Sequence, residues 1–171
     1  MDPPPNPTLE YKIAVIKNNT DNIIILIKFI MNVNIALLTV TDTRTFDNDK
    51  SGAILVDKIK EASHNLIDRK ICKDNKEDII IILKEWIKQK NIDVIITTGG
   101  TGLTGIDITP EAVDEIADKH IPGFGEVFRN ISLKTVGTSA IQSRACAVLA
   151  NGKYIFALPG SSGGVTDAWD G

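Results

Sequence analysis

The chain has 171 residues, of which 43% are hydrophobic and 24% charged, and its formal net charge is −3. This length and composition are typical of one globular domain and argue against a disordered or fibrous chain. Proteins that bind nucleic acid usually carry a marked basic excess, so the slightly acidic balance indicates that nucleic acid is not a partner.

The cysteines and histidines do not have the spacing of a metal site. Cys72 and Cys146 lie far apart in the sequence without a Cys-x-x-Cys pair, and His64 and His120 have no ligand spacing with each other or with a cysteine. Zinc is therefore not expected. We interpret both cysteines as small, buried apolar residues of a protein in a reducing compartment.

The most apolar run near the start covers residues 23–30, and Lys28 interrupts it. It is much shorter than the roughly 20 residues that a membrane span requires. Glu10 and Asp21 precede the run and no small-residue cleavage site follows it, which argues against a signal peptide. The sequence therefore predicts a cytoplasmic protein with no membrane partner.

Residues 1–32 are interpreted as an N-terminal extension that is poorly ordered, and residues 33–171 as the folded domain. Residues 1–7 are rich in proline, a composition that predicts disorder. Residues 8–29 are compatible with a poorly ordered extension, with an added edge strand, or with an arbitrary chain boundary. We assign this segment no function.

From residue 33 onward, strand patterns alternate with helix patterns. The continuous apolar run 33–40 is typical of a strand that is covered on both faces. Helical spacing of apolar residues predicts a helix over 50–64, and a more polar strand nearer a sheet edge follows over 66–72. The clearest helix covers 75–89, and 92–98 reads as a second buried strand.

The second half begins with a helix-start signal at Thr109-Pro110-Glu111. This segment offers an N-cap hydroxyl, a proline for the first helical position and an acid in the first turn. We expect that helix to end near Lys119. The remaining expected elements are a helix over 126–134, another helix after Ser139, a turn at Asn151-Gly152, a strand over 154–158 and a last helix after Ser161.

Alternating strands and helices predict a three-layer α/β/α fold, with a mostly parallel sheet covered by helices on both faces. In such sheets, ligands bind beyond the carboxyl ends of the strands. Three segments rich in polar residues and glycine are expected there, at residues 41–51, 98–107 and 159–164. The sequence thus places a candidate site at one edge of the sheet.

The strongest local signal is the segment Thr98-Gly99-Gly100-Thr101-Gly102, which directly follows a buried strand. Glycines allow a tight turn in which several N–H groups point into one concavity, an arrangement that binds phosphate. The positive end of the following helix favours the same ligand. A G-x-G-x-x-G fingerprint and a sequence ending in Gly-Lys-Ser/Thr are both missing, which argues against dinucleotides and ordinary P-loop ligands.

Charged residues near this segment have two readings each. Asp107 is compatible with a magnesium ion that bridges carboxylate and phosphate, or with local capping of backbone amides. Asp74 either reaches the same edge of the sheet or caps the following helix. Arg129 and Arg144 suit phosphate oxygens as well as surface ion pairs. The acids of the first loop, namely Asp42, Asp47 and Asp49, are interpreted as solvated charge.

Seven segments then occur in a characteristic order and at fitting spacings. They are residues 39–44 (TVTDTR), 51–52 (SG), 97–102 (TTGGTG), 107–111 (DITPE), 122–129 (PGFGEVFR), 142–145 (QSRA) and 158–161 (LPGS). Together they resemble the MoaB/MogA family of molybdenum cofactor biosynthesis proteins, and the MoaB branch in particular. The resemblance extends from about residue 29 to the end of the chain.

The resemblance implies a molybdopterin-binding domain that assembles as a trimer or a hexamer. It also implies Mg²⁺-dependent adenylylation, in which ATP and molybdopterin react to give adenylylated molybdopterin and pyrophosphate. Two aspartates are important in active members of the family, and their counterparts here are Asp74 and Asp107. Asp107 is also the expected magnesium ligand.

Further site residues follow from the matching segments. The expected phosphate- and substrate-binding residues are Ser51, Gly52, Thr98, Gly99, Gly100, Thr101, Gly102, Glu111, Arg129, Ser143, Arg144, Pro159, Gly160 and Ser161. Residues 159–161, together with Ser51, are expected to line the pterin pocket. The last helix is expected to be truncated at Gly171.

Three other functions remain compatible with the sequence. A protein of the same fold could carry molybdopterin without turnover, and a scaffold could use residues 1–32 to bind a partner. Without the resemblance, the physical pattern supports a general nucleotide-binding α/β domain.

Overall fold

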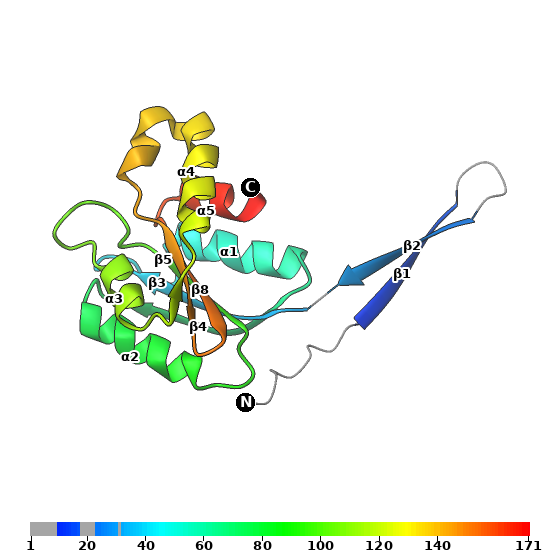
Figure 1. Cartoon of the computed structure of the whole chain (residues 1–171), viewed down its shortest axis with the longest axis horizontal. Coiled ribbons are helices and arrows are strands. Elements are labelled where there is room, and N and C mark those ends of the chain that lie inside the picture. Colours follow the sequence, from blue (N-terminus) through cyan, green and yellow to red (C-terminus); the bar gives the residue numbers. More distant parts are fainter. Residues whose placement is uncertain (1–9, 18–22, 31) are drawn as a thin grey trace.

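The computed structural model describes residues 10–17, 23–30 and 32–171 (Figure 1). Strands β1 (Glu10–Lys17) and β2 (Ile23–Ile30) pair antiparallel with each other in a two-stranded sheet, and in the described residues they do not extend the main sheet. The expected disorder of residues 1–7 lies outside the described residues. The division of the chain at residue 32 stays a prediction.

The main sheet has six strands in the order β4-β3-β5-β8-β7-β6. Their bounds are β3 Asn34–Val40, β4 Asn65–Cys72, β5 Val94–Thr98, β6 Lys119–His120, β7 Cys146–Ala150 and β8 Lys153–Leu158. Strands β4, β3, β5 and β8 run parallel, whereas β7 and β6 join the sheet antiparallel. The predicted mostly parallel α/β fold is confirmed.

Helices cover both faces of the sheet (Figure 1). Their bounds are α1 Lys50–Glu61, α2 Lys76–Ile87, α3 Thr109–Glu115, α4 Pro122–Val136, the 3₁₀ helix η1 Gly137–Gln142, and α5 Ser162–Asp170. Helices α1 and α5 pack on one face, and α2 and α3 on the other. No helix in the described part of the chain has the length and apolar character needed to cross a membrane.

Strand β3 shows why its residues form an unbroken apolar run. Ile35 and Leu37 pack on the α1 and α5 side, while Ala36, Leu38 and Val40 pack on the α2 and α3 side. All five are at most 3% exposed. Because successive side chains point to opposite faces of a sheet, a strand covered on both faces needs apolar residues at every position.

The region after the glycine-rich segment differs from the expectation in several places. The helix that starts at Thr109 ends at Glu115 rather than near Lys119, because the chain then enters the short strand β6. Helix α4 begins at Pro122, four residues earlier than expected. After residue 139 the chain forms η1 and then β7, where only a helix was expected. The short apolar run of β7 has no period that separates a strand from a buried helix.

Two expected helix caps were also wrong. Asn75, not Asp74, caps α2, because the Asn75 side chain accepts a hydrogen bond from Asp78 N at 3.0 Å. Thr109 is the first residue of α3 rather than its cap, and Ile108 takes the cap position without a side-chain hydrogen bond. The side chains of Asp74 and Thr109 therefore do not cap these helices.

The strand order places the candidate site. Strands β4 and β5 lie on either side of β3, and the helices that follow β3 and β4 cover opposite faces. This reversal of chain direction opens a crevice at the carboxyl ends of the strands, where ligands bind in such folds. The first loop (residues 41–49), the glycine loop (98–102) and the third loop (159–161) follow the strands β3, β5 and β8 at this edge.

Candidate functional site

Gly99 is the point at which the three loops meet. It has a φ of +107°, and its N–H donates to Leu158 O at 3.0 Å. A Cβ at Gly99 would overlap the carbonyl oxygen of Val40, and a Cβ at Gly160 would lie 3.2 Å from the Gly99 Cα. The close approach of three strand ends therefore requires glycine at position 99.

Gly100 brings the glycine loop against Asp74. Its φ is +63°, and a Cβ there would overlap both Asp74 Oδ1 and Thr109 Oγ1. Both oxygen atoms are buried and have no hydrogen-bond partner within the described residues. Of the two interpretations of Asp74, the structure shows the one in which it reaches the glycine loop, since Asp74 follows β4 and Gly100 follows β5.

The neighbouring amides suit an anion. In the part of the chain that the structure describes, the N–H groups of Gly100 and Thr101 donate to no protein acceptor. The Gly100 carbonyl, in contrast, accepts from Thr109 N at 3.0 Å and so fixes the loop to the start of α3. Two adjacent amides in a glycine turn, next to a helix start, form the kind of concavity that binds a phosphate oxygen.

Asp107 lies at the other end of the glycine loop. Its Oδ2 accepts from Thr104 N at 3.0 Å and from the Thr104 hydroxyl, and a Cβ at Gly102 would be 2.7 Å from the same oxygen. The Thr104 hydroxyl is the main cause that lowers the pKa of Asp107, with a further contribution from the charge of Arg144. Asp107 therefore caps the loop as an ionised carboxylate, and its role toward magnesium stays a prediction.

The pKa of Asp74 is shifted in the opposite direction from that of Asp107. Burial, followed by the charges of Asp107 and Asp42, raises the pKa of Asp74. Asp42 from the first loop accepts a hydrogen bond from Asp74 N at 3.3 Å. Three carboxylates thus surround the glycine loop, and their mutual repulsion favours a bound cation.

These oxygen donors fit magnesium, which prefers carboxylates and phosphate oxygens. The buried Asp74 Oδ1, which has no hydrogen-bond partner among the described residues, is one available metal ligand. The described residues contain no group of three or more His, Cys, Asp or Glu side chains that could hold a metal. A magnesium ion at this edge would therefore take its remaining ligands from water and substrate phosphates, as Mg²⁺ commonly does.

Arg144 holds the glycine loop in place from outside. Its Nε donates to Gly102 O at 2.7 Å, its Nη2 donates to Asp107 O at 2.6 Å, and its Nη1 pairs with Glu111. Its main-chain N–H also donates to Thr101 O at 2.9 Å. Arg144 and Glu111 therefore lie beside the glycine loop with contacts to the protein, and their predicted binding of phosphate or substrate stays a prediction.

Arg129 likewise contacts the main chain. Its Nη1 donates to Ser143 O and Ala145 O, both at 3.3 Å. Gly125 allows this approach, since a Cβ there would be 2.7 Å from the same Ala145 oxygen. The direct binding of phosphate by Arg129 stays a prediction.

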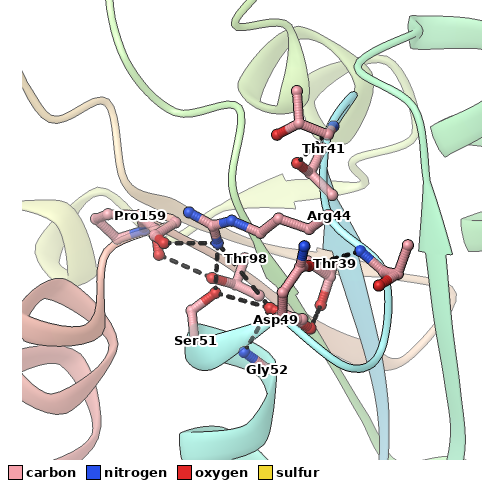
Figure 2. Close-up of polar contacts among 12 residues, drawn as sticks. Thr39, Thr41, Arg44, Asp49, Ser51, Gly52, Thr98 and Pro159 are labelled. Atoms are coloured by element: carbon pink, nitrogen blue, oxygen red, sulfur yellow. Dashed lines mark hydrogen bonds and ion pairs between the residues drawn. The ribbon is translucent and has the colours of Figure 1, made fainter.

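A buried acid, Asp49, organises the start of α1 (Figure 2). Its carboxylate accepts from Thr39 Oγ1 at 2.7 Å, Gly52 N at 3.0 Å, Arg69 Nη2 at 2.8 Å and Ser51 Oγ at 3.2 Å. Burial alone would raise the pKa of Asp49, but these hydrogen bonds and the charge of Arg69 together lower it. The interpretation of Asp49 as solvated charge was wrong, because Asp49 is a buried helix cap.

Ser51 and Gly52, two predicted substrate-binding residues, belong to this cap and are buried in the first turn of α1. Thr98 is also buried, and its hydroxyl donates to Pro159 O at 2.8 Å. That bond fixes the third loop to the end of β5. Ser161 caps α5 by accepting from Gly164 N at 3.1 Å.

The sequence interpretation assigned no site role to Arg44. Its Nη1 donates to Ser51 Oγ at 3.0 Å and to Gly160 O at 2.9 Å (Figure 2). Arg44 thereby connects the first loop to the third loop. A basic residue in a polar loop after a buried strand was the available signal, but no pattern in the sequence shows which loops such a residue connects.

A cavity of about 210 Å³ adjoins the glycine loop at Thr101. Three more predicted residues line it, namely Ser143, Pro159 and Ser161. Asp167 of α5 also lines the cavity, and its Oδ2 accepts from Ser132 Oγ at 2.9 Å and from Thr135 Oγ1 at 2.7 Å. The structure therefore places the third loop and residue 143 around one hollow beside the candidate phosphate site.

Comparison with known proteins gives consistent results. Residues 36–171 match the family model described as "Probable molybdopterin binding domain". The "Molybdenum cofactor biosynthesis protein B" of Escherichia coli strain K12 is 44% identical over 136 residues, which are 80% of this chain and 80% of that protein.

Solved structures agree with the sequence matches. A crystal structure of a "Molybdenum cofactor biosynthesis protein B" aligns with a TM-score of 0.80 and 43% identity, covering 82% of this chain and 88% of that one. The "tungsten cofactor synthesizing protein MoaB" from Pyrococcus furiosus aligns with a TM-score of 0.73 and 34% identity, covering 81% of this chain and 89% of that one.

Proposed function

This chain belongs to the family of molybdopterin-binding domains that includes the MoaB and MogA proteins of molybdenum cofactor biosynthesis, and we propose that it is a molybdopterin adenylyltransferase. In the proposed reaction, a terminal phosphate oxygen of molybdopterin attacks the α-phosphorus of ATP. A new P–O bond forms, the bond from the α-phosphorus to the β-bridging oxygen breaks, and pyrophosphate leaves.

One observation carries the proposal: the glycine loop places two amides, which have no acceptor among the described residues, between two carboxylates whose pKa values are shifted in opposite directions. Gly100 and Thr101 supply the amides, Asp74 lies against Gly100, and Asp107 lies against Gly102. A phosphate that attacks another phosphate brings like charges together, so catalysis depends on positioning and on neutralising cations. Amides for the anion and carboxylates for the cation supply both requirements.

Each residue then has a defined task. The amides of Gly100 and Thr101 would hold one phosphate group, and Asp107, assisted by Asp74, would hold magnesium. The magnesium ion would neutralise phosphate charge during the transfer. Asp74 Oδ1 and Thr109 Oγ1 would each gain a partner at the moment that the ligands bind, because neither has one among the described residues.

The pterin end of molybdopterin is assigned to the cavity beside Thr101. Ser143, Pro159 and Ser161 provide polar and apolar walls next to the glycine loop. Asp167 provides a carboxylate that could accept hydrogen bonds from the donor edge of a pterin ring. ATP would then occupy the acidic side of the glycine loop, near Asp42 and Asp74.

The proposed protein is cytoplasmic and assembles as a trimer or hexamer. Exposed apolar side chains on α4 and η1 support self-association, namely Val127, Val136 and Ile141, which are 58%, 52% and 75% exposed. Surfaces of this kind are often covered in an assembly. Sedimentation equilibrium would measure the subunit number, and a strictly monomeric protein would contradict this part of the proposal.

The catalytic proposal is tested with purified protein, molybdopterin, ATP and magnesium, with the adenylylated product measured by mass. We expect product from the wild type and a loss of at least about 100-fold in Asp107→Asn, the scale of removing one electrostatic stabiliser of a transition state. Asp57→Asn, which removes a carboxylate from the exposed side of α1, is the matched control and should retain activity. Tight molybdopterin binding without product would instead indicate a carrier.

A further inference from the structure

We propose that Arg44 is an anion-binding residue of the site, whose guanidinium contacts a phosphate oxygen of a bound substrate. The inference rests on the proposed function in that it assumes phosphate-bearing substrates. It adds a residue from the first loop and places a positive charge on the side of Gly160, whereas Asp74 and Asp107 lie against Gly100 and Gly102.

The contacts of Arg44 leave most of its guanidinium available. Nη1 makes the hydrogen bonds to Ser51 Oγ and Gly160 O, and it is also the atom that lies 3.9 Å from Asp49 Oδ1. Within the described residues, these contacts do not use Nε or Nη2. The side chain is 36% exposed, and the two hydrogen bonds of Nη1 fix its orientation (Figure 2). An arginine held in this way loses little further freedom when it binds an anion.

The charge of Arg44 is also not consumed by Asp49. The Asp49 carboxylate pairs with Arg69 at 2.8 Å, and it accepts further hydrogen bonds from Thr39 and Gly52. Because Asp49 already has a close cationic partner, the more distant Arg44 keeps much of its positive potential. Arg44 is also partly exposed, whereas the Asp49 side chain is fully buried.

The position of Arg44 suits a phosphate at the glycine loop. A Cβ at Gly160 would be 3.8 Å from Arg44 Nη1 and 3.2 Å from the Gly99 Cα, so the guanidinium lies beside the contact between these two glycines. The acids Asp74 and Asp107 lie instead against Gly100 and Gly102. The glycine loop therefore has a basic end and an acidic end.

Other arginines near the loop are engaged with the protein. Arg144 contacts Gly102, Asp107 and Glu111, and Arg129 contacts two main-chain carbonyl oxygens. Arg144 uses Nε, Nη1 and Nη2 in its contacts, whereas the contacts of Arg44 and Arg129 within the described residues use Nη1 alone. Of these two, it is Arg44 that lies beside Gly99 and Gly160. A guanidinium with free donors matches phosphate geometry better than any ammonium group does.

The test compares the binding of ligands with and without phosphate, each measured separately by titration calorimetry. The ligand pairs are Mg-ATP with adenosine, and molybdopterin with phosphatase-treated molybdopterin. The variants are Arg44→Gln and Arg44→Lys, and the matched control is Lys90→Gln, which removes one positive charge from an exposed turn. Thermal melting confirms that each variant is folded.

Arg44→Gln should weaken at least one phosphorylated ligand by about 10- to 100-fold, the scale of a lost charge-assisted hydrogen bond. Its unphosphorylated counterpart should bind as in the wild type. Arg44→Lys should lose less, because it keeps the charge, and Lys90→Gln should match the wild type. The affected pair identifies the source of the phosphate, which is the nucleotide or the pterin.

Two results would overturn the inference. Equal losses for phosphorylated and unphosphorylated ligands would show that Arg44 only fastens the first loop to the third loop. Unchanged affinities for both phosphorylated ligands would exclude the contact altogether. Binding is measured without turnover, so the two proposals can fail separately. If the protein forms no product but its affinity still depends on Arg44, the proposed reaction is refuted and this inference is supported.

Discussion

Arg144 Nε donates a hydrogen bond of 2.7 Å to the carbonyl oxygen of Gly102, although the two residues are 42 positions apart in the chain. This contact joins the segment before β7 to the glycine loop. Together with the bond from Arg144 Nη2 to Asp107 O, it fixes both ends of the turn that carries Asp107. The guanidinium therefore sets the shape of the candidate site from behind.

Replacing Arg144 should destabilise the protein, because the contacts between these segments would be lost. We expect Arg144→Ala to lower the free energy of unfolding by about 2 kcal/mol, because hydrogen bonds to charged groups contribute roughly 1.5–3 kcal/mol each to stability and this residue is partly exposed. Glu111→Gln is the control, since it keeps both carbonyl contacts and weakens an exposed ion pair by less than about 1 kcal/mol. Urea denaturation measures the free energy of unfolding of both variants. If Glu111→Gln lost as much stability as Arg144→Ala, the carbonyl contacts of Arg144 would not be what stabilises the loop.

Gly100 should not tolerate a side chain. Gly100→Ala places a Cβ against Asp74 Oδ1 and Thr109 Oγ1 at a φ of +63°, and backbone strain of this kind costs about 1–3 kcal/mol. The variant should also lose affinity for Mg-ATP. Gly105→Ala is the matched control in the same segment, because no atom lies within 4 Å of the added Cβ. If both variants melt and bind alike, the tight contact at Gly100 is incorrect.

Asp74 should make stability depend on pH. Folding raises the pKa of Asp74 above its unfolded value of about 3.9, so the ionised carboxylate opposes folding at neutral pH. Without divalent cations, Asp74→Asn should therefore melt at a higher temperature than the wild type at pH 7. The difference should shrink as the pH falls through the raised pKa of Asp74, because the native carboxyl is then protonated. Asp57→Asn is the control, and a difference that grows with acidity would contradict the sign.

The cavity beside Thr101 should accept the pterin rather than the nucleotide. Ser139 lines this cavity, so Ser139→Trp should fill it and weaken molybdopterin binding by at least about 10-fold, a loss of about 1.4 kcal/mol. Binding of Mg-ATP should change little. Thr138→Trp adds the same ring at an exposed neighbour that is not among the lining residues. Loss of ATP binding in Ser139→Trp would reverse the assignment of the two substrates.

Much of the fold was predictable because its strands are covered on both faces. The strands β3 and β5 are mostly apolar and buried, and the stripe of α2 has a clear helical period, so local pattern and burial agree. Strand β7 was missed because five small or apolar residues carry no period of their own. Its identity as a strand depends on pairing with β8, a contact that becomes visible only in three dimensions.

The parts of the candidate site that need an uncommon sequence, such as consecutive glycines, were predictable. The side-chain contacts between distant segments were less so. Gly99 and Gly100 indicate the loop because few turns use consecutive glycines. Connectivity allowed Asp74 to reach the same edge of the sheet but left a helix cap as the alternative. Asp49 was misread because an acid in a polar loop usually faces solvent. Only the fold shows that Arg69, which lies 20 residues further along the chain, reaches this acid and compensates its burial.

The most direct test of the central claim is the stoichiometry of the reaction with wild-type protein. Molybdopterin, ATP and magnesium would be mixed with the protein, and both adenylylated molybdopterin and pyrophosphate would be quantified over time. The account predicts one pyrophosphate for each adenylylated molybdopterin, with both formed at least about 100-fold more slowly by Asp107→Asn. Folded wild-type protein that binds both substrates and yields neither product would contradict it.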